Sequence, residues 1–366
     1  MTVKHIAIAA LLGSACTAQA GGIDRSGQSI LALFESGRYA EFSLGAVSPD
    51  TSGTSVVGLG GAGSGDMTSS FLQLGAAYKA DINDRLSYAI IYDQPFGADV
   101  DYPAGTGYYA AGAAADLDAH AITGLLRYKF QNNFSVHGGV RVQSIEATAA
   151  IPFIGGYAVN GARDIGVGYV AGVAYERPDI ALRVALTYNS GIEHDVETTE
   201  SFGGAPLPTT TTQIETPQSI NLDFRTGIAQ DTLLFGGIRW AEWSEFDITP
   251  VGYAGATGGA SLVSYDNDVF TYSLGVGRRL NENWSVSASV GFEKSNGGFA
   301  SNLGPTDGFK SLALAAVYTQ DNMKITTGIR YINIGDAQTA IPGFAPAANF
   351  EDNHAVAIGV KVGYNF

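Results

Sequence analysis

The chain has 366 residues, of which 45% are hydrophobic and 15% charged, and its formal net charge is −15. This acidic balance excludes nucleic acid as a partner, because phosphates require a basic protein surface. No apolar run reaches the roughly 18 residues that a transmembrane helix needs. The only cysteine, Cys16, lies close to the N-terminus.

Residues 1–20 have the features of a secretory signal peptide. The segment "MTVKHIAIAALLGSACTAQA" has an early lysine, an apolar core over 6–12 and the small-x-small end Ala18-Gln19-Ala20. A lipoprotein anchor at Cys16 is disfavoured, because Gly13 stands where an aliphatic residue is required. We therefore expect an exported protein whose mature chain has no thiol and no disulfide.

Residues 21–37 lie between this leader and the first expected strand. Within them, "SILALFES" has helical character, with Ile30, Leu33 and Phe34 on one side. We expect the segment to fold into the protein as a short plug. The alternative is a disordered leader, which its apolar content disfavours.

The rest of the chain alternates apolar and polar residues, which is the period of a strand with one apolar face. In 284–293, for example, Trp284 and Phe292 share an apolar face while Ser287 and Glu293 share a polar one. The fourteen expected strands are 38–48, 66–80, 86–94, 114–130, 134–151, 162–176, 180–193, 215–230, 232–248, 264–281, 284–296, 306–320, 323–335 and 353–366.

The connections between these strands alternate strictly in length. Tight polar turns such as "DINDR" and "NEN" alternate with long connections rich in Gly, Pro and Thr. This pattern predicts an all-β fold, a 14-stranded antiparallel transmembrane barrel over 38–366, with both ends on the periplasmic side of a bacterial outer membrane. A soluble sandwich or propeller is the alternative, but no four-strand repeat is present.

Aromatic residues gather at the turn ends of the expected strands and predict a girdle at the periplasmic face of the membrane. The girdle residues are Tyr78, Tyr128, Phe130, Phe134, Tyr175, Trp284, Tyr318, Tyr364 and Phe366. We expect membrane lipid and lipopolysaccharide as surroundings, and the barrel-assembly machinery as a partner of Phe366.

Several blocks resemble the FadL family of outer-membrane transporters, in the order that this family has them. The blocks are "FESGRYAEFSLGAVSPDTSGT", "YKFQNNFSVHGGVRV", "GVAYERPDIALRVALTYNSGIEHDV", "ETPQSINLDFRTGI", "RWAEWSEFDI", "LGVGRRLNENWSVSASVGFEKS" and "GIRYINIGD". The resemblance implies fourteen strands, an N-terminal hatch in the lumen and passive uptake of hydrophobic compounds. It also implies a lateral opening at a kinked third strand, which corresponds here to Pro95, Phe96 and Gly97.

The chain departs from the family in its plug and in its charges. The plug is short and lacks an Asn-Pro-Ala motif, the long connections contain no Lys or Arg, and "ATAAIPF" has no arginine on the fifth strand. Long-chain fatty acids are the expected cargo of a monomer, with monoaromatic hydrocarbons as the alternative within the family. The expected ligand-binding residues are Ile30, Leu33, Phe34, Arg141, Phe153, Phe202 and Arg239.

Other functions are less well supported by the residues. A general porin for hydrophilic solutes would need an unplugged lumen, and an enzyme would need a Ser/His/Asp-type constellation, which is not discernible. The histidines are scattered, so neither a metal nor a cofactor is expected. We interpret Trp240, Trp243 and Phe246 of "RWAEWSEFDI" as part of an aromatic belt. We also expect several arginines to point into the lumen, where they would pair with Asp223, Glu242 and Glu293: Arg141, Arg183, Arg225, Arg239, Arg278 and Arg330.

Overall fold

The computed structural model describes residues 23–341 and 344–366, which form a closed 14-stranded antiparallel barrel. Closure occurs between the first and last strands, because Tyr39 pairs with Asn365 while the other edge of the first strand pairs with the second. The predicted fold is therefore confirmed. The barrel strands are β1 (Tyr39–Asp50), β3 (Phe71–Asp81), β4 (Leu86–Asp93), β6 (Ala114–Lys129), β7 (Phe134–Ile151), β8 (Tyr157–Arg177), β9 (Leu182–Asn189), β13 (Ser219–Ala229), β14 (Thr232–Ala241), β17 (Val269–Arg279), β18 (Trp284–Glu293), β20 (Phe309–Gln320), β21 (Met323–Ile334) and β24 (His354–Asn365).

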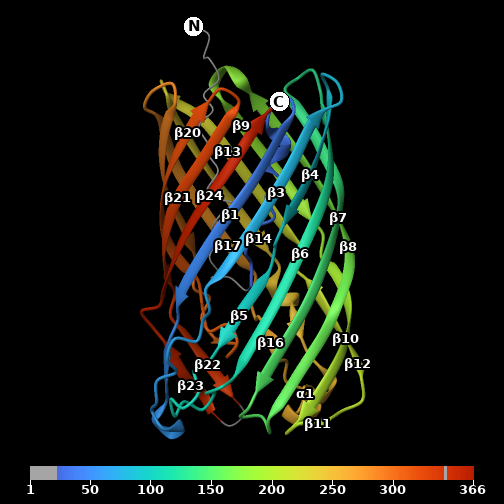
Figure 1. The fold of residues 1–366 in the computed structure, drawn as a ribbon, viewed down its shortest axis with the longest axis vertical. Helices are drawn as coiled ribbons and strands as arrows, with labels where there is room; N and C mark the ends of the chain where they lie inside the picture. The colour runs from blue at the N-terminus through green and yellow to red at the C-terminus, as the bar shows by residue number, and fades with distance from the viewer. Residues whose placement is uncertain (1–22, 342–343) are drawn as a thin grey trace.

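The two ends of the barrel differ as the spacing of the strands predicts. Short turns join the strands at the end drawn uppermost in Figure 1, and long connections extend the opposite end. Positive φ angles at Asn133, Asp231 and Asp321 close three of the short turns, in residue types that tolerate this conformation. We call these ends the turn end and the loop end. The predicted signal peptide, residues 1–20, lies outside the described residues.

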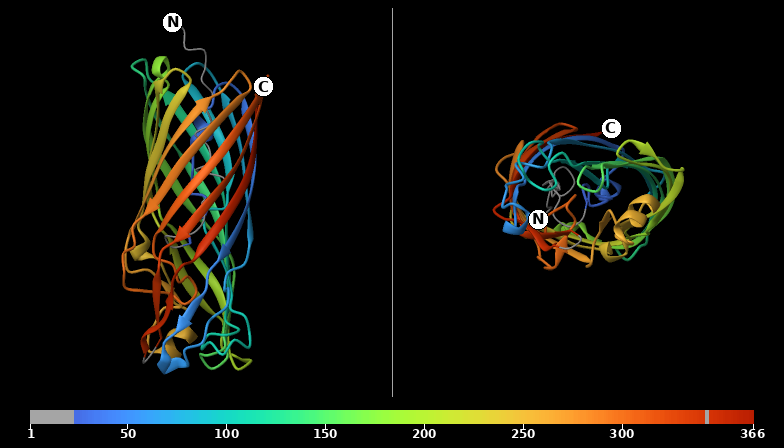
Figure 2. Two further views of the ribbon diagram at one scale, coloured as in Figure 1. Left: turned by 90° about the vertical axis from the view of Figure 1, so that its left-hand side faces the viewer. Right: turned by 90° about the horizontal axis from the view of Figure 1, so that it is seen from below.

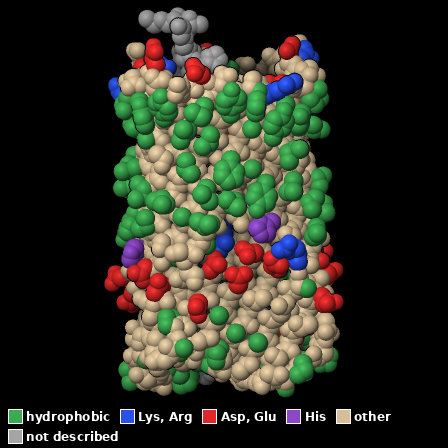
Figure 3. All heavy atoms as spheres, viewed as in Figure 1, with side chains coloured by type: hydrophobic (Ala, Val, Ile, Leu, Met, Phe, Trp, Pro, Cys, Tyr) green, Lys and Arg blue, Asp and Glu red, His purple; other side chains and the backbone are tan. Residues whose placement is uncertain are grey.

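Side chains alternate between the lumen and the outer wall along each strand. On β18, Trp284, Val290 and Phe292 are exposed on the outside, whereas Ser285 and Glu293 are buried in the interior. Hydrophobic side chains cover the part of the wall nearer the turn end, and a band of acidic side chains lies below them (Figure 3). Because a closed barrel pairs its backbone groups between strands, such a wall can face hydrocarbon. None of the helices in the described ranges is long and apolar enough to span a membrane.

The girdle residues contact one another in pairs at the turn end. Examples are Phe134 with Tyr175, Trp284 with Tyr318, and Tyr364 with Phe366, with ring centroids 4.8, 5.0 and 5.0 Å apart. One expected lumenal arginine is placed differently. Arg278 is exposed on the same face of β17 as Tyr272 and Val276, so its expected lumenal position is wrong.

The third and the seventh strands are interrupted. The break at Pro95 lies where the kinked third strand was expected, but the strands that follow the two interruptions differ from the sequence prediction. The third strand stops at Asp93 and resumes as β5 (Gly97–Asp101), within a stretch predicted to be a loop. Beyond β9, the chain continues as β10 (Ile192–Phe202), which pairs with β8 and with β12 (Thr210–Thr216). The Thr-rich segment predicted as a loop is thus a hairpin that extends the wall at the loop end (Figure 1).

The long connections fold back over the loop end of the lumen. They form a sheet of β2 (Gly53–Ser55), β19 (Phe299–Ala300), β22 (Ala337–Ile341) and β23 (Phe344–Phe350), and the pair β15 (Asp247–Ile248) and β16 (Val263–Ser264). Two 3-10 turns, a two-residue strand and one short helix complete this end, namely η2 (Val57–Leu59), η4 (Trp243–Glu245), β11 (Ala205–Pro206) and α1 (Val251–Thr257). A further turn, η3 (Pro178–Ile180), lies at the turn end.

The N-terminal segment of the described chain lies inside the barrel (Figure 2). It contains one 3-10 turn, η1 (Leu31–Phe34), before β1 begins. Ala32, Leu33 and Phe34 are buried against lumenal side chains that include Leu125 and Ala174. We call residues 23–38 the plug.

Candidate functional site

The first residues of the plug are held by a network around Arg239 of β14. Arg239 Nε donates to Asp24 Oδ2 at 2.6 Å, and its Nη groups donate to the Gly27 carbonyl and to Gln28 Oε1. Asn221 Nδ2 also donates to the Gly27 carbonyl at 2.9 Å. Arg239 is therefore occupied by the plug rather than directed into an open cavity.

The plug also contacts the interruption in the third strand. The backbone N–H of Arg25 donates to the Pro95 carbonyl at 2.8 Å, and the N–H of Gly97 donates to the Ile23 carbonyl at 2.9 Å. The plug thus takes the place of a neighbouring strand where β3 and β5 part. Phe96 is buried beside the plug, with its ring 5.6 Å from that of Trp243 at an interplanar angle of 84°.

The side chain of Arg25 spans this interruption. Its guanidinium forms an ion pair with Asp99 of β5 and lies 4.0 Å from the centroid of the Phe71 ring on β3. β3 pairs with the third strand only from Ala76 onward, so Phe71 borders the unpaired stretch. Arg25 therefore bridges the two strand edges that separate here.

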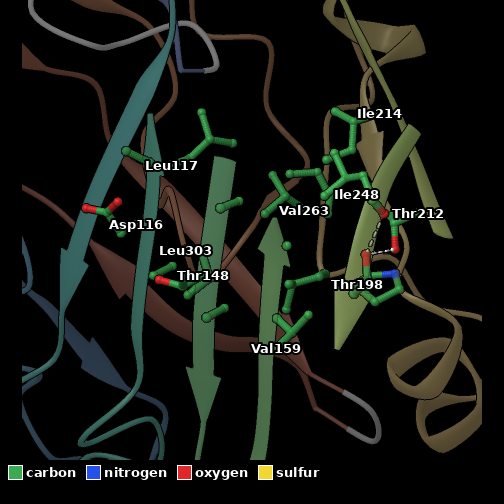
Figure 4. A pocket seen from close by; sticks show the side chains of 18 of the residues that line it. Asp116, Leu117, Thr148, Val159, Thr198, Thr212, Ile214, Ile248, Val263 and Leu303 are labelled. Carbon is green, nitrogen blue, oxygen red and sulfur yellow. Dashed lines mark hydrogen bonds between the residues drawn. The ribbon is translucent and has the colours of Figure 1, made fainter. Parts of the chain in front are cut away.

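An apolar cavity of about 50 Å³ lies between the plug and the loop end of the lumen. Figure 4 shows its side chains, which converge from β6, β8, β10, β12 and the segments around β15 and β16. Ile23, the first described residue of the plug, forms part of its wall. The other lining side chains include Ala98, Leu117, Ala147, Val159, Val196, Ile214, Phe246, Ile248, Val263 and Leu303.

The cavity offers little to a charged ligand. Among the described residues that line it, none is basic, and the one acidic residue, Asp116, is exposed on the opposite face of β6 from Leu117. The hydroxyls of Thr198 and Thr212 are hydrogen-bonded to each other at 2.9 Å (Figure 4). Since these hydroxyls are already paired within the wall, the surface suits an uncharged apolar molecule.

The expected ligand-binding residues lie around this cavity but do not line it. Ile30, Leu33 and Phe34 belong to the plug itself and pack against the lumenal wall towards the turn end. Arg141 is buried on β7 and donates from Nε to Thr123 Oγ1 at 2.9 Å. Its Nη1 has no hydrogen-bond partner within the described residues.

Phe153 and Phe202 belong to an aromatic cluster at the loop end. Phe153 packs against Tyr109, with ring centroids 5.7 Å apart, and Phe202 packs against Tyr157 at 5.2 Å. Burial raises the pKa of Tyr102 in this cluster well above its usual value. Its neutral hydroxyl donates to the Asn302 carbonyl at 2.7 Å, so the cluster joins two long connections.

Trp243 and Phe246 contribute to the site in a way that the sequence prediction missed. Both side chains are 1% exposed and pack in the lumen with Ile23 and Leu117, so their assignment to an outer aromatic belt is wrong. The strand pattern ends at Ala241, after which the chain turns inward through η4. The available signal was Trp243 followed by Phe246, the i, i+3 spacing of a helical turn rather than of a strand.

The expected acidic partners of the lumenal arginines also differ. Glu242 accepts a hydrogen bond from Gln218 rather than from an arginine, and Glu293 accepts one from Thr271 Oγ1 at 2.8 Å. Arg239 pairs with Asp24, which is 215 residues away in the chain. The Arg239–Asp24 pair depends on the path of the plug, and the alternation of the strands does not reveal that path.

Known structures share this architecture at low sequence identity. A Pseudomonas aeruginosa FadL homologue superimposes with a TM-score of 0.72 at 14% identity, covering 92% of each chain. The P. putida toluene transporter TodX gives 0.67 at 14% identity with 92% of each chain covered. The Ralstonia pickettii toluene transporter TbuX gives 0.63 at 13% identity, covering 92% of this chain and 91% of that one.

A search of curated protein sequences finds no match. A family model described as outer membrane protein transport protein (OMPP1/FadL/TodX) matches residues 38–366, which comprise all fourteen barrel strands. The chain therefore belongs to this family of outer-membrane transport proteins.

Proposed function

We propose that the protein is a passive outer-membrane channel that takes up uncharged hydrophobic compounds of monoaromatic size. The observation that carries this proposal is the apolar cavity beside Ile23, whose lining within the described chain has no basic side chain. Two of the similar structures are toluene transporters, which agrees with such a cargo. The sequence shows no nucleotide-binding motif, so diffusion is the driving process.

Binding would be driven by burial of apolar surface, at about 25 cal/mol for each Å² removed from water. The cavity measures about 50 Å³, whereas an engineered cavity of about 150 Å³ is known to hold benzene. The cavity must therefore widen to admit cargo. Its wall includes Val263 and Leu303, which belong to the long connections rather than to the paired barrel strands, and these can move most easily.

Long-chain fatty acids are a second candidate cargo, favoured by Arg141. The buried Arg141 has a free Nη1 donor among the described residues, and a carboxylate is a suitable acceptor. Ala147, in the cavity wall, lies six residues further along β7, or about 20 Å at the rise of a strand. A long alkyl chain would have to cover that distance between the guanidinium and the apolar cavity.

In this proposal the cargo leaves the lumen sideways, through the interruption formed by Pro95, Phe96 and Gly97. Pro95 has no N–H to donate to a ladder, which favours an interruption at this position. Arg25 bridges the two strand edges through Asp99 and Phe71. Release of this contact would let an apolar cargo pass directly into the lipid instead of crossing the aqueous periplasm.

The test is uptake of radiolabelled toluene and of a long-chain fatty acid by an outer-membrane host that lacks its own channel of this kind. Ala147→Phe would fill the cavity from β7, and we expect it to reduce toluene uptake at least fivefold. Val142→Phe is the matched control, because Val142 is exposed on the outer wall of the same strand and does not line the cavity. Equal uptake by both variants would contradict the assignment of the cavity.

The preferred substrate of the wild-type channel decides between the candidates. Toluene uptake without fatty-acid uptake supports the first, whereas fatty-acid uptake that Arg141→Gln abolishes supports the second. If neither compound enters and hydrophilic sugars do, the protein is a porin and the proposal fails.

A further inference from the structure

A second cavity, of about 80 Å³, lies in the half of the lumen nearer the turn end. It is bounded by Leu31 of the plug and by side chains from β9, β13, β14, β17, β18, β20 and β21. It shares no lining residue with the apolar cavity. Unlike that cavity, it is lined by charged side chains, namely Arg183, Asp223, Arg225 and Arg330.

Two of these arginines are placed side by side by the strand register. Arg183 of β9 pairs directly with Arg225 of β13, and both side chains line the cavity. Like charges directly opposite on neighbouring strands destabilise a sheet. Arg183 is only 5% exposed, so water screens this repulsion poorly. The arrangement therefore favours an anion placed between the two guanidinium groups.

Hydrogen-bond donors of both arginines are unused. Within the described residues, Arg183 Nη1 and Arg225 Nε are buried and have no hydrogen-bond partner. A buried charged donor without an acceptor costs free energy. The ring of Phe34 lies 4.7 Å from Cζ of Arg183 and holds its guanidinium in place. The donor groups are thus held at the cavity with no acceptor among the described residues.

The surrounding side chains carry more positive than negative charge. The Glu35 carboxylate interacts electrostatically with Lys324, Arg183, Arg225 and Lys361, so it is shared among several cations. Lys361 also pairs with Glu41 at 3.4 Å. Among the described residues, the cations of this region include Arg183, Arg225, Lys324, Arg330 and Lys361. The carboxylates that interact with them are Glu35, Glu41, Asp223 and Glu176, and Glu176 is already paired with Arg127.

We propose that this cavity binds one compact anion, a carboxylate or a phosphate, between Arg183 and Arg225. Both groups match the planar, forked donors of arginine. The volume of about 80 Å³ admits one anionic group with no more than a short apolar extension, which Leu31 and Phe235 would contact. This site is independent of the proposed hydrophobic cargo, because it lies in a separate cavity with different chemistry.

Isothermal titration calorimetry on the full-length barrel in a neutral detergent tests the proposal, with inorganic phosphate and butyrate as probes. We expect one molecule of at least one probe to bind per barrel, with competition from added chloride. Arg225→Gln should weaken binding at least tenfold. Arg278→Gln is the matched control, because Arg278 lies on the outer face of β17, and it should bind as the wild type does.

Glu35→Gln provides a second, independent test that keeps every arginine. The Glu35 carboxylate competes with a bound anion for the same cations, so its removal should tighten anion binding several-fold. Unchanged or weaker binding would count against the site. Migration of unheated samples in gels shows whether each variant is folded.

The two probes also distinguish the sources of the anion. Binding of butyrate alone supports a site for a carboxylate with a short apolar extension, and binding of phosphate, with or without butyrate, supports a site for soluble anions. The proposal is overturned if the wild type binds neither probe, or if folded Arg225→Gln and Arg183→Gln variants bind as the wild type does.

Discussion

At the scale of single residues, Arg239 determines where the plug lies. It donates to Asp24, Gly27 and Gln28 of the plug, and also to Ser219 and Asn221 of the wall. Each hydrogen bond to a charged group contributes roughly 1.5–3 kcal/mol. The Asp24 carboxylate would be left partly buried without its cation if Arg239 were replaced, which is costly.

We therefore expect Arg239→Met to release the first part of the plug while the barrel stays folded. In planar bilayers the variant should show ionic conductance at least several-fold above that of the wild type, because water and ions would pass the displaced segment. Arg278→Met, on the outer wall, should conduct as the wild type does. A folded Arg239→Met channel that stays as closed as the wild type would show that other contacts suffice.

At the scale of elements, the Arg25 bridge across the interrupted third strand depends on the absence of a side chain at Gly97. A Cβ atom added to Gly97 would lie 2.3 Å from Cζ of Arg25, so the arginine would have to move. Gly124 on β6 offers a control, since a Cβ atom added there meets nothing within 4 Å. Comparing Gly97→Ala with Gly124→Ala thus distinguishes loss of the Arg25 contact from the general effect of placing alanine on a strand.

Gly97→Ala should displace Arg25 from Asp99 and Phe71 and leave the interruption unbridged. If this bridge limits lateral exit, uptake of labelled toluene by cells should rise at least twofold relative to Gly124→Ala. Uptake equal to that of the control, in a variant of normal abundance, would mean that the Arg25 bridge does not limit transport.

The sequence predicts the elements well where local chemistry decides them. β7 matches its predicted range of 134–151, because period-two alternation and an Asn-rich turn define it locally. β5 was missed because Pro95 interrupts the pattern, and the position of Trp243 was missed because the chain turns inward after Ala241. The apolar cavity could not be predicted, since its walls come from many strands and connections whose approach is a long-range property.

At the scale of the whole molecule, the barrel and the plug are stabilised by different contacts. The wall is a ladder of barrel strands that closes between β1 and β24, and the plug contributes backbone hydrogen bonds to it at the interrupted third strand alone among the described contacts. Deleting residues 23–37 should therefore leave a folded barrel that admits hydrophilic solutes. Uptake of a sugar by liposomes should rise at least tenfold. A deletion variant that stays impermeable would mean that the loop-end connections alone close the lumen.

Ile23 belongs at once to the apolar cavity, to the plug and, through its carbonyl, to the hydrogen bond with Gly97 at the interrupted strand. A molecule that enlarges the cavity towards the plug acts on this residue, and a shift of Ile23 alters the cavity. Thermodynamic linkage makes the relation reciprocal: if cargo favours a displaced plug, a displaced plug binds cargo more tightly by the same factor. Plug variants are consequently expected to change cargo affinity as well as leakage, even where they touch no cargo.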